Sequence, residues 1–554
     1  MRQKLWVWGV VVALLLWFAP LGSYTLFNPD EGRYAEIPRE MVASGDWVTP
    51  RLNDLKYFEK PPLHYWATAA AFTVFGEHEW SARAWVALSG FLGLLLTAWI
   101  GTRVYGARAG AMAALVQGGS LLYLALARMS TLDMGLTVAL ELALAGLLLL
   151  VSEQGASRER NRAPSSARTG ALLLALGTAL AFLSKGLVGI LIPGVVATLY
   201  LLLRRDWRLL LRARPWWVLI ALALIAAPWV LLVSQRNPEF ARFFFIHEHF
   251  ERFLTRVHAR YEPDWFFVPV LLLGFLPWTE LLPAVIARSY RSCRAGDGAA
   301  WMLVLWVLFG FLFFSVSQSK LIPYILPLFP ALALLTGSTL AELPAPRLMR
   351  ALAVAAALWM VLGALVLALM AVRWFAPAWS PHLDIGAGMA APLMAVAFIA
   401  AGLACAYAAR LALRRGALAA TVAGAVSTLL LLGMLPLAAD QLPRQRELAH
   451  LIAAVRPELK PATPFYCVDD YEQSIPFYLD RTCTLVRYRG ELDFGLNQQP
   501  ERWVADLPQF ALRWRAESNA VAMIRPSSFP ALQRMGLPMR VIYTAPSMVA
   551  VVRQ

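Results

Sequence analysis

The residues that could do chemistry gather between residues 28 and 66, a charged and aromatic stretch flanked by long apolar segments. Asp30 and Glu31 come directly after the first apolar segment, where paired carboxylates can orient a sugar, act as a base or stabilise positive charge. A helix cap with a solvated charge is the simpler interpretation. Asp133 favours the functional one, because an ionisable group in a short turn within apolar sequence is costly. We expect Asp30 and Asp133 to meet in one cavity as catalytic groups.

Lys60 is a candidate ligand for a phosphate. It precedes Pro61 and Pro62, which hold its backbone extended. A rigidly placed ammonium at the membrane surface suits a phosphate or pyrophosphate. The alternative is that the side chain merely snorkels to the surface, which is the better explanation for Lys185. Further cations near helix ends, each ambiguous alone, are Arg252, Arg256 and Lys320.

A metal site is a second possible use of the polar loops. The histidines of the loop 234–264 show no HExxH spacing, and the chain has no CxxC. A divalent metal bridging Glu59 and His249 or His258 is one interpretation, and hydrogen bonding of these histidines to phosphate or carboxylates is the other. No Walker loop and no GxGxxG after a strand is present, so a nucleotide cofactor has no support. No cofactor is expected to be required.

The composition sets the class of protein. Of the 554 residues, 59% are hydrophobic and 15% are charged, which is too apolar for a soluble protein of this size. The net charge of +15 would suit nucleic acid, but the arginines cluster in short loops between apolar segments. That is the positive-inside pattern. The sequence therefore predicts a multi-pass membrane protein that binds no nucleic acid.

Apolar segments long enough to cross a bilayer recur along residues 1–437. We expect a mostly α domain with about thirteen transmembrane helices, the first over residues 5–26. Placing the arginine-rich loops in the cytoplasm puts the N-terminus there as well. The long polar loops 27–66 and 234–264 then share the opposite, external side with residues 438–554.

Residues 438–554 differ in kind from the rest. Strand-like runs alternate there with helix-like stretches, which predicts a small α/β domain on the external side. The strand-like runs are 465–468, 484–488, 520–524, 540–543 and 548–552, and the helix-like stretches are 446–455 and 529–534. Cys467 and Cys483 lie on neighbouring strand-like runs. Two interpretations remain for this pair: a disulfide, which an external compartment permits, and two buried thiols.

Several motifs together resemble a known family. The run NPDEGRYAEIPREM at 28–41, YFEKPP at 57–62, FFFIHEHFERF at 243–253 and SQSKLIPYILP at 317–327 resemble bacterial lipid-linked glycosyltransferases of the GT-C fold. These are related to protein O-mannosyltransferases. The aminoarabinose transferase family, which modifies lipid A, is the nearest resemblance, and it extends over the whole membrane part.

The resemblance implies an enzyme of the bacterial inner membrane with a periplasmic active site. Its donor would be undecaprenyl phosphate carrying 4-amino-4-deoxy-L-arabinose, its acceptor a lipid A phosphate, and its consequence polymyxin resistance. Asp30 matches the acidic residue after the first helix, and Lys60 matches the lysine that binds the lipid phosphate. The other residues that the resemblance places in the substrate cavity are Arg33, Tyr34, Tyr57, Asp133, His249, Arg252, Lys320 and Tyr324.

Two alternatives stay open. In the first, the fold is the same but the acceptor is a serine or threonine of a secreted protein, and Asp30 would then have to act as a base. A lipid transporter is the second alternative. Transporters often carry internal inverted repeats, and none is obvious in this sequence.

Overall fold

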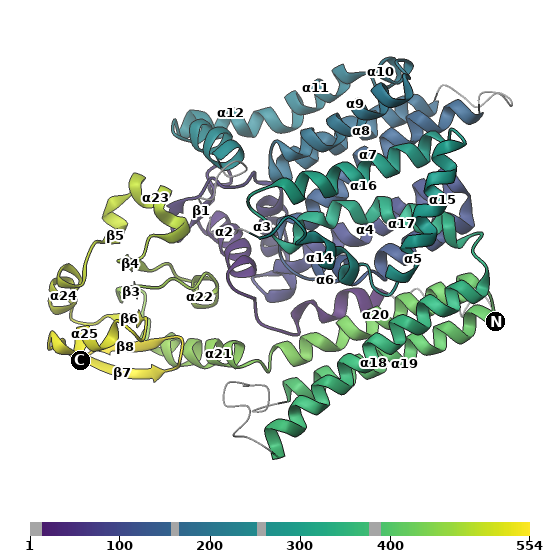
Figure 1. The fold of residues 1–554 in the computed structure, drawn as a ribbon. Helices are drawn as coiled ribbons and strands as arrows, with labels where there is room; N and C mark the ends of the chain where they lie inside the picture. Colours follow the sequence, from purple (N-terminus) through teal and green to yellow (C-terminus); the bar gives the residue numbers. More distant parts are fainter. Residues whose placement is uncertain (1–13, 157–164, 252–261, 376–388) are drawn as a thin grey trace.

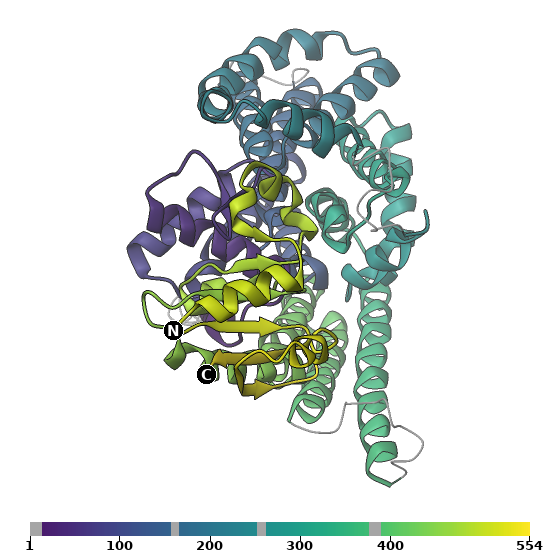
Figure 2. The ribbon, with the colours of Figure 1, turned by 90° about the vertical axis from the view of Figure 1, so that its left-hand side faces the viewer.

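A bundle of long helices makes up most of the molecule, and a small α/β domain lies at one end of it (Figure 1). The computed structural model describes residues 14–156, 165–251, 262–375 and 389–554. In Figure 2 the yellow C-terminal domain lies beside the purple N-terminal helices. The segments with α10 and the end of α15, which carry arginine clusters, lie at the opposite end of the bundle (Figure 1).

Nine helical segments of the described residues are long and apolar enough to span a membrane. The number is ten if the bent pair α14 (Phe267–Gly274) and η4–α15 (Thr279–Arg294) forms one span. The prediction of a mostly α, multi-pass membrane protein is confirmed. The nine are α4 (Glu79–Tyr105), α7 (Leu132–Ala156), α8 (Ser165–Lys185), α10–α12 (Arg208–Arg236), α16 (Gly298–Val316), η5–α17 (Ile322–Leu340), α18 (Ala345–Phe375), α19 (Ala390–Arg414) and α20 (Ala417–Ala439).

Helix α7 lies at the centre of the bundle. In the apolar stretch of this span, 89% of the residues are buried inside the protein, against 28% for α18. Its carboxylate Glu141 accepts a hydrogen bond from Thr97 Oγ1 at 2.5 Å and one from Gln117 Nε2 at 3.3 Å. A polar group in a membrane interior needs such partners, because no water is there to replace them.

The predicted first helix lies partly outside the described residues, and its described part ends in the turn η1 (Ala19–Gly22). The charged stretch that follows folds into α2 (Asp30–Ser44), the short hairpin β1 (Arg51–Leu52) and β2 (Leu55–Lys56), and α3 (Leu63–Phe75). Asp30 and Glu31 occupy the first turn of α2, where carboxylates interact favourably with the helix dipole. The helix ends where Gly45 adopts φ 71°.

The C-terminal domain is built on a six-stranded sheet with the order β5-β4-β3-β6-β8-β7, which confirms the predicted α/β fold. The first four strands in this order are parallel, and β8 and β7 continue the sheet antiparallel. The strands are β3 (Phe465–Val468), β4 (Thr484–Val486), β5 (Trp503–Val504), β6 (Val521–Ile524), β7 (Met539–Thr544) and β8 (Val549–Arg553).

Helices cover both faces of this sheet. Along β3, side chains alternate between the two faces, so that Phe465 packs with α21 (Pro443–Val455) and Tyr466 packs with α24 (Leu507–Ala516). The first of these layers also takes in apolar residues of α2 and β1. The domain is therefore packed against the charged segment that contains α2 and the hairpin. Its remaining helices are α22 (Ser474–Leu479), α23 (Asp493–Gln498) and α25 (Phe529–Arg534).

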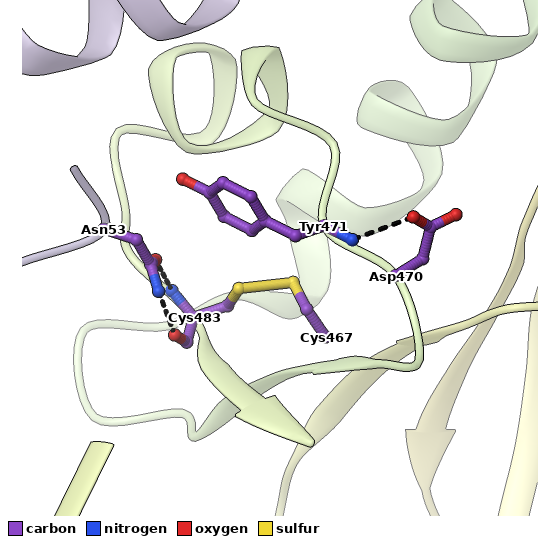
Figure 3. Close-up of a disulfide and its surroundings, with 5 residues drawn as sticks. All are labelled: Asn53, Cys467, Asp470, Tyr471 and Cys483. Atoms are coloured by element: carbon purple, nitrogen blue, oxygen red, sulfur yellow. Dashed lines mark hydrogen bonds between the residues drawn. A yellow bond between two sulfur atoms is a disulfide. The ribbon is translucent and has the colours of Figure 1, made fainter. Parts of the chain in front are cut away.

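A disulfide joins Cys467 of β3 to Cys483, directly before β4, which decides between the two predicted alternatives (Figure 3). Asn53 lies beside it. The Asn53 side chain donates to the Cys483 carbonyl and accepts from the Cys483 amide, both at 2.8 Å. Gly32 makes a second close contact, since a Cβ there would lie 2.4 Å from the backbone nitrogen of Ser474. Both contacts hold the domain against α2 and the hairpin.

Candidate active site

One cavity opens where the start of α2 meets the turn before α7, the end of α8 and the segment η5 (Ile322–Leu328). Most of the residues predicted to form the site line it. Its lining consists of Asp30, Arg33, Tyr34, Glu59, Lys60, Thr131, Leu132, Asp133, Lys185, Leu321, Pro323 and Tyr324. Three carboxylates and three cationic side chains therefore share one pocket, an arrangement suited to a substrate that carries both an amine and a phosphate.

Lys60 lies at the wall of this cavity between the two long loops. Its Nζ donates to the backbone carbonyl of Glu59 at 2.8 Å and to Oε2 of Glu248 at 3.1 Å. Glu248 belongs to η3 (Arg242–Glu251), so the second loop supplies the counter-ion of a lysine from the first. The Lys60 side chain is 12% exposed. An ammonium so placed can contact a ligand while its charge stays balanced.

Lys185 also lines this cavity, where the sequence favoured a snorkelling side chain. Helix α8 ends at this residue, and Gly186 turns the chain at φ 76°. The ammonium lies 2.5 Å from Oδ1 of Asp133 and 4.3 Å from the ring centre of Tyr324. Ion pairing and a cation–π contact hold it in the cavity, whereas a lone snorkelling lysine would extend toward the surface. The break in apolar sequence at SKG was the signal for it.

Asp30 faces the cavity with 46% of its side chain exposed. Arg33, one turn later in α2, lies 3.2 Å from Oδ1 of Asp30 through Nη1. The other guanidinium nitrogen, Nη2, lies 2.5 Å from Oε2 of Glu491. Glu491 belongs to the C-terminal domain, and nothing in its local sequence indicates a site residue. The C-terminal domain thus reaches the side chain that borders Asp30.

Glu31, the neighbour of Asp30, does not line the cavity. Its side chain is fully buried and accepts from Arg83 of α4 through Nε and Nη2, both at 2.8 Å. The same carboxylate accepts from the backbone amides of Phe27 at 3.0 Å and of Ser130 at 2.8 Å. It therefore ties α2, α4 and the turn before α7 together. Because Asp30 and Asp133 flank these tied segments, Glu31 sets their relative placement.

A buried polar layer lies behind the cavity. Burial raises the pKa of Tyr34 and of Tyr57, so both phenols stay protonated at neutral pH. Burial also lowers the pKa of His64 to about 3, which keeps this imidazole neutral. Among the described residues, Tyr57 Oη, Tyr65 Oη and Arg33 Nε are buried without a hydrogen-bond partner. Such atoms can bind water or a polar part of a substrate.

Comparison with known proteins shows the family. Residues 7–244 match the family described as dolichyl-phosphate-mannose-protein mannosyltransferase, and residues 451–553 match the aminoarabinose transferase C-terminal domain. The chain is 32% identical to the undecaprenyl phosphate-α-4-amino-4-deoxy-L-arabinose arabinosyl transferase of Pseudomonas aeruginosa (strain UCBPP-PA14), over 95% of this chain and 94% of the relative. The chain belongs to the undecaprenyl phosphate-aminoarabinose transferase family.

Solved structures agree with this membership. The crystal structure of ArnT from Cupriavidus metallidurans bound to undecaprenyl phosphate superposes with a TM-score of 0.89 at 35% identity, and it covers 100% of this chain and 98% of that one. The oligosaccharyltransferase AglB from Archaeoglobus fulgidus matches with a TM-score of 0.50 at 12% identity, which shows a shared fold alone. The predicted GT-C fold is confirmed, and the chain is a membrane glycosyltransferase of this family.

The remaining predicted residues of the family site lie apart or are not described. Tyr57 and Lys320 are outside the cavity lining. The Lys320 ammonium donates to the backbone carbonyl of Glu262 at 2.9 Å and lies 3.5 Å from Asp264. Arg252 and His258 fall outside the described residues, as does the side chain of His249.

The predicted metal site stays a prediction. Glu59 lines the cavity, but its proposed partners His249 and His258 fall among the side chains that are not described. Within the described residues, no group of three or more His, Cys, Asp or Glu is placed to hold a metal ion.

Proposed function

We propose that this chain transfers 4-amino-4-deoxy-L-arabinose from undecaprenyl phosphate to a phosphate of lipid A, on the periplasmic side of the bacterial inner membrane. The donor is the one that the names of its relatives state, and a solved relative binds undecaprenyl phosphate. The observation that carries the proposal is the cavity in which Lys60 and Lys185 lie with Asp30 and Asp133.

The lipid phosphate of the donor is the group that Lys60 would bind. When the bond between the sugar C1 and the lipid phosphate oxygen breaks, its electron pair stays on that oxygen and negative charge grows there. An ammonium aimed at growing charge in a shielded cavity stabilises the transition state more than the ground state. Lys60 would turn from Glu248 toward this phosphate, so that its positive charge offsets the negative charge of the lipid phosphate.

The carboxylates would act on the sugar. C1 gains positive, oxocarbenium-like character as the bond breaks, and the Asp30 carboxylate would stabilise it. Asp133, which Lys185 contacts, would bind the sugar amine with its carboxylate. The new bond forms between C1 and an oxygen of the acceptor phosphate. Because that phosphate is already an anion, the transfer needs no strong general base.

The positions of the arginine clusters support the orientation. They lie at the end of the bundle opposite the C-terminal domain (Figure 1). With those clusters in the cytoplasm, the cavity and the domain face the periplasm. Thirteen spans are reached when the first helix, α5–α6 (Ala107–Leu126), α9 (Val188–Arg204) and the bent pair join the nine long segments.

A transfer assay tests the proposal. Purified protein in vesicles is given undecaprenyl phosphate-aminoarabinose and either lipid A or a serine- and threonine-rich peptide, and the products are read by mass spectrometry. We expect aminoarabinose on lipid A only. Sugar on the peptide would favour the second acceptor class, which the match of residues 7–244 to a protein mannosyltransferase family raises. Movement of donor across the vesicle membrane without any product would reject transfer altogether.

A further inference from the structure

The C-terminal domain contributes a carboxylate to the neighbourhood of the cavity. Oε2 of Glu491 lies 2.5 Å from Nη2 of Arg33, while Nη1 of the same guanidinium lies 3.2 Å from Oδ1 of Asp30. The side chains of Arg33 and Glu491 are 5% and 15% exposed, so water screens this pair weakly. One planar guanidinium therefore bridges the C-terminal domain and the proposed catalytic carboxylate.

Glu491 is itself held in place. Its Oε1 accepts from Nε2 of Gln473 at 2.6 Å. Glu491 follows β4 and Gln473 follows β3, so both lie beyond the carboxyl ends of parallel strands. In parallel sheets these ends are where functional groups gather. Directly after Gln473, Ser474 packs against Gly32 and its amide donates to Asn28, which fixes this edge of the sheet against α2.

We propose that Glu491 is a positioning residue for the transfer reaction: by binding Arg33, it fixes the Asp30 carboxylate at the cavity. The proposal rests on the function proposed above. Arg33 interacts with three carboxylates, namely Asp30, Glu59 and Glu491. Without Glu491, the guanidinium turns toward Asp30, its other ion-pair partner, and the carboxylate that must face the sugar is displaced.

A substitution with a matched control separates this role from simple domain attachment. Glu491→Gln keeps the size of the side chain and removes its charge. Asp480→Asn removes another ion pair between the same domain and the same helix, because Asp480 lies 2.6 Å from Arg39, which does not line the cavity. We expect Glu491→Gln to lower kcat about 10- to 100-fold with little change in KM for the donor. Asp480→Asn should match the parent, and Glu491→Asp should retain part of the activity.

A double-mutant cycle shows whether Glu491 acts through Arg33. In an Arg33→Gln background, adding Glu491→Gln should change kcat less than about 2-fold, because the partner through which it acts is gone. A full additional loss in that background would overturn the proposal. So would a parent-like kcat in Glu491→Gln, or an equal loss in Asp480→Asn.

A readout without substrate keeps this proposal separate from the proposed function. A carbodiimide labels accessible carboxyl groups that are not held in an ion pair, and Asp30 is exposed enough to react. Losing the charge of Glu491 lets Arg33 bind Asp30 more closely, so Asp30 should be labelled less at a fixed pH in Glu491→Gln than in the parent or in Asp480→Asn. Equal labelling in all three proteins would overturn the positioning role even if transfer occurs. Reduced labelling in a chain that transfers no aminoarabinose would leave the positioning role standing and reject the function.

Discussion

Arg83 and Glu31 form an ion pair in which neither side chain is exposed to solvent. Arg83 also donates to the backbone carbonyls of Leu21, Tyr24 and Thr25, and its guanidinium lies 3.7 Å from the ring centre of Tyr24. Every part of this guanidinium is thus engaged. The pair joins the segment from η1 to Thr25 to α2 and α4, and so forms the support on which the cavity is built.

Removing Arg83 should destabilise the protein strongly. In Arg83→Met the buried Glu31 loses its counter-ion, which costs about 3–5 kcal/mol in comparable buried pairs. Thermal unfolding of the purified protein measures the change. The control is Arg236→Met, whose partner Asp46 and own side chain are partly exposed, so that about 0–1 kcal/mol is expected. An equal loss of stability in the two variants would show that the buried pair stabilises the protein no more than the exposed pair does.

Lys60 and Asp30 should be needed for transfer. Lys60→Ala loses a charged contact to a shielded phosphate, which costs about 2–4 kcal/mol, or a few tens to several hundredfold in rate. Lys60→Arg should keep some activity, because the charge remains while the geometry changes. Asp30→Asn keeps the shape without the charge and should fail. The measurement is polymyxin survival in a host lacking its own transferase, with lipid A mass spectra.

The control for Lys60 is Lys56→Ala. Lys56 belongs to the same loop and pairs with Glu239 at 2.5 Å outside the cavity lining. Cells that carry Lys56→Ala should survive polymyxin like cells that carry the parent protein, when the two proteins are present in the membrane at equal levels. If Lys60→Ala and Asp30→Asn survive equally well, the site is assigned to the wrong residues.

Lys185 should contribute to kcat/KM for the transfer reaction. Lys185→Met removes a cation from the cavity and leaves Asp133 without its 2.5 Å contact. We expect a loss of about 10- to 100-fold in kcat/KM, since a charge-assisted contact is worth about 1.5–3 kcal/mol. Lys185→Arg should recover part of it. Unchanged kcat/KM in Lys185→Met would mean that this lysine only anchors the end of α8.

The disulfide should be present in the isolated protein. Peptide maps with and without reductant should differ at Cys467 and Cys483, and thiol blocking during isolation should leave both unlabelled. The two cysteines are 16 residues apart, so closing their loop should stabilise the fold by about 3 kcal/mol. Cys467→Ser should lower the unfolding temperature, whereas Cys293→Ser, at a free cysteine, should not. Labelling of both residues without reductant would reject the bond.

The proposed orientation predicts which positions a membrane-impermeant thiol reagent reaches. In a cysteine-free background, Glu501→Cys of the C-terminal domain should be labelled in cells whose outer membrane is permeabilised. Arg294→Cys, in an arginine cluster at the other end of the bundle, should be labelled only after lysis. Both positions are exposed, so burial does not explain a difference. The reverse pattern would invert the topology.

The sequence predicted the α/β class of the C-terminal domain better than its individual strands and helices. The run 465–468 and the helix 529–534 match β3 and α25, because hydrophobic patterns within four to six residues determine them. The strand β5 (Trp503–Val504) was missed, since two residues carry no readable alternation and this strand exists only through its pairing with β4. The helix α24 beside it was missed as well.

The same distinction applies to the site. Asp30, Lys60 and Asp133 stood out because charge within apolar sequence is visible locally. Glu248 and Glu491 did not, because each is defined by a contact across the fold, to Lys60 and Arg33 respectively. A local pattern can indicate a group that is costly to bury, but it cannot identify a distant partner.

The partners of Glu141 also bear on how the chain enters the membrane. Thr97 and Gln117 precede α7 in the sequence, while α16, which also packs on α7, follows it by more than a hundred residues. During synthesis, the two side chains that donate hydrogen bonds to this carboxylate therefore enter the membrane before α7 leaves the translocon. A rearranged chain in which α7 is made before α4 and α5 would expose Glu141 to lipid at that step, and its insertion should be less efficient.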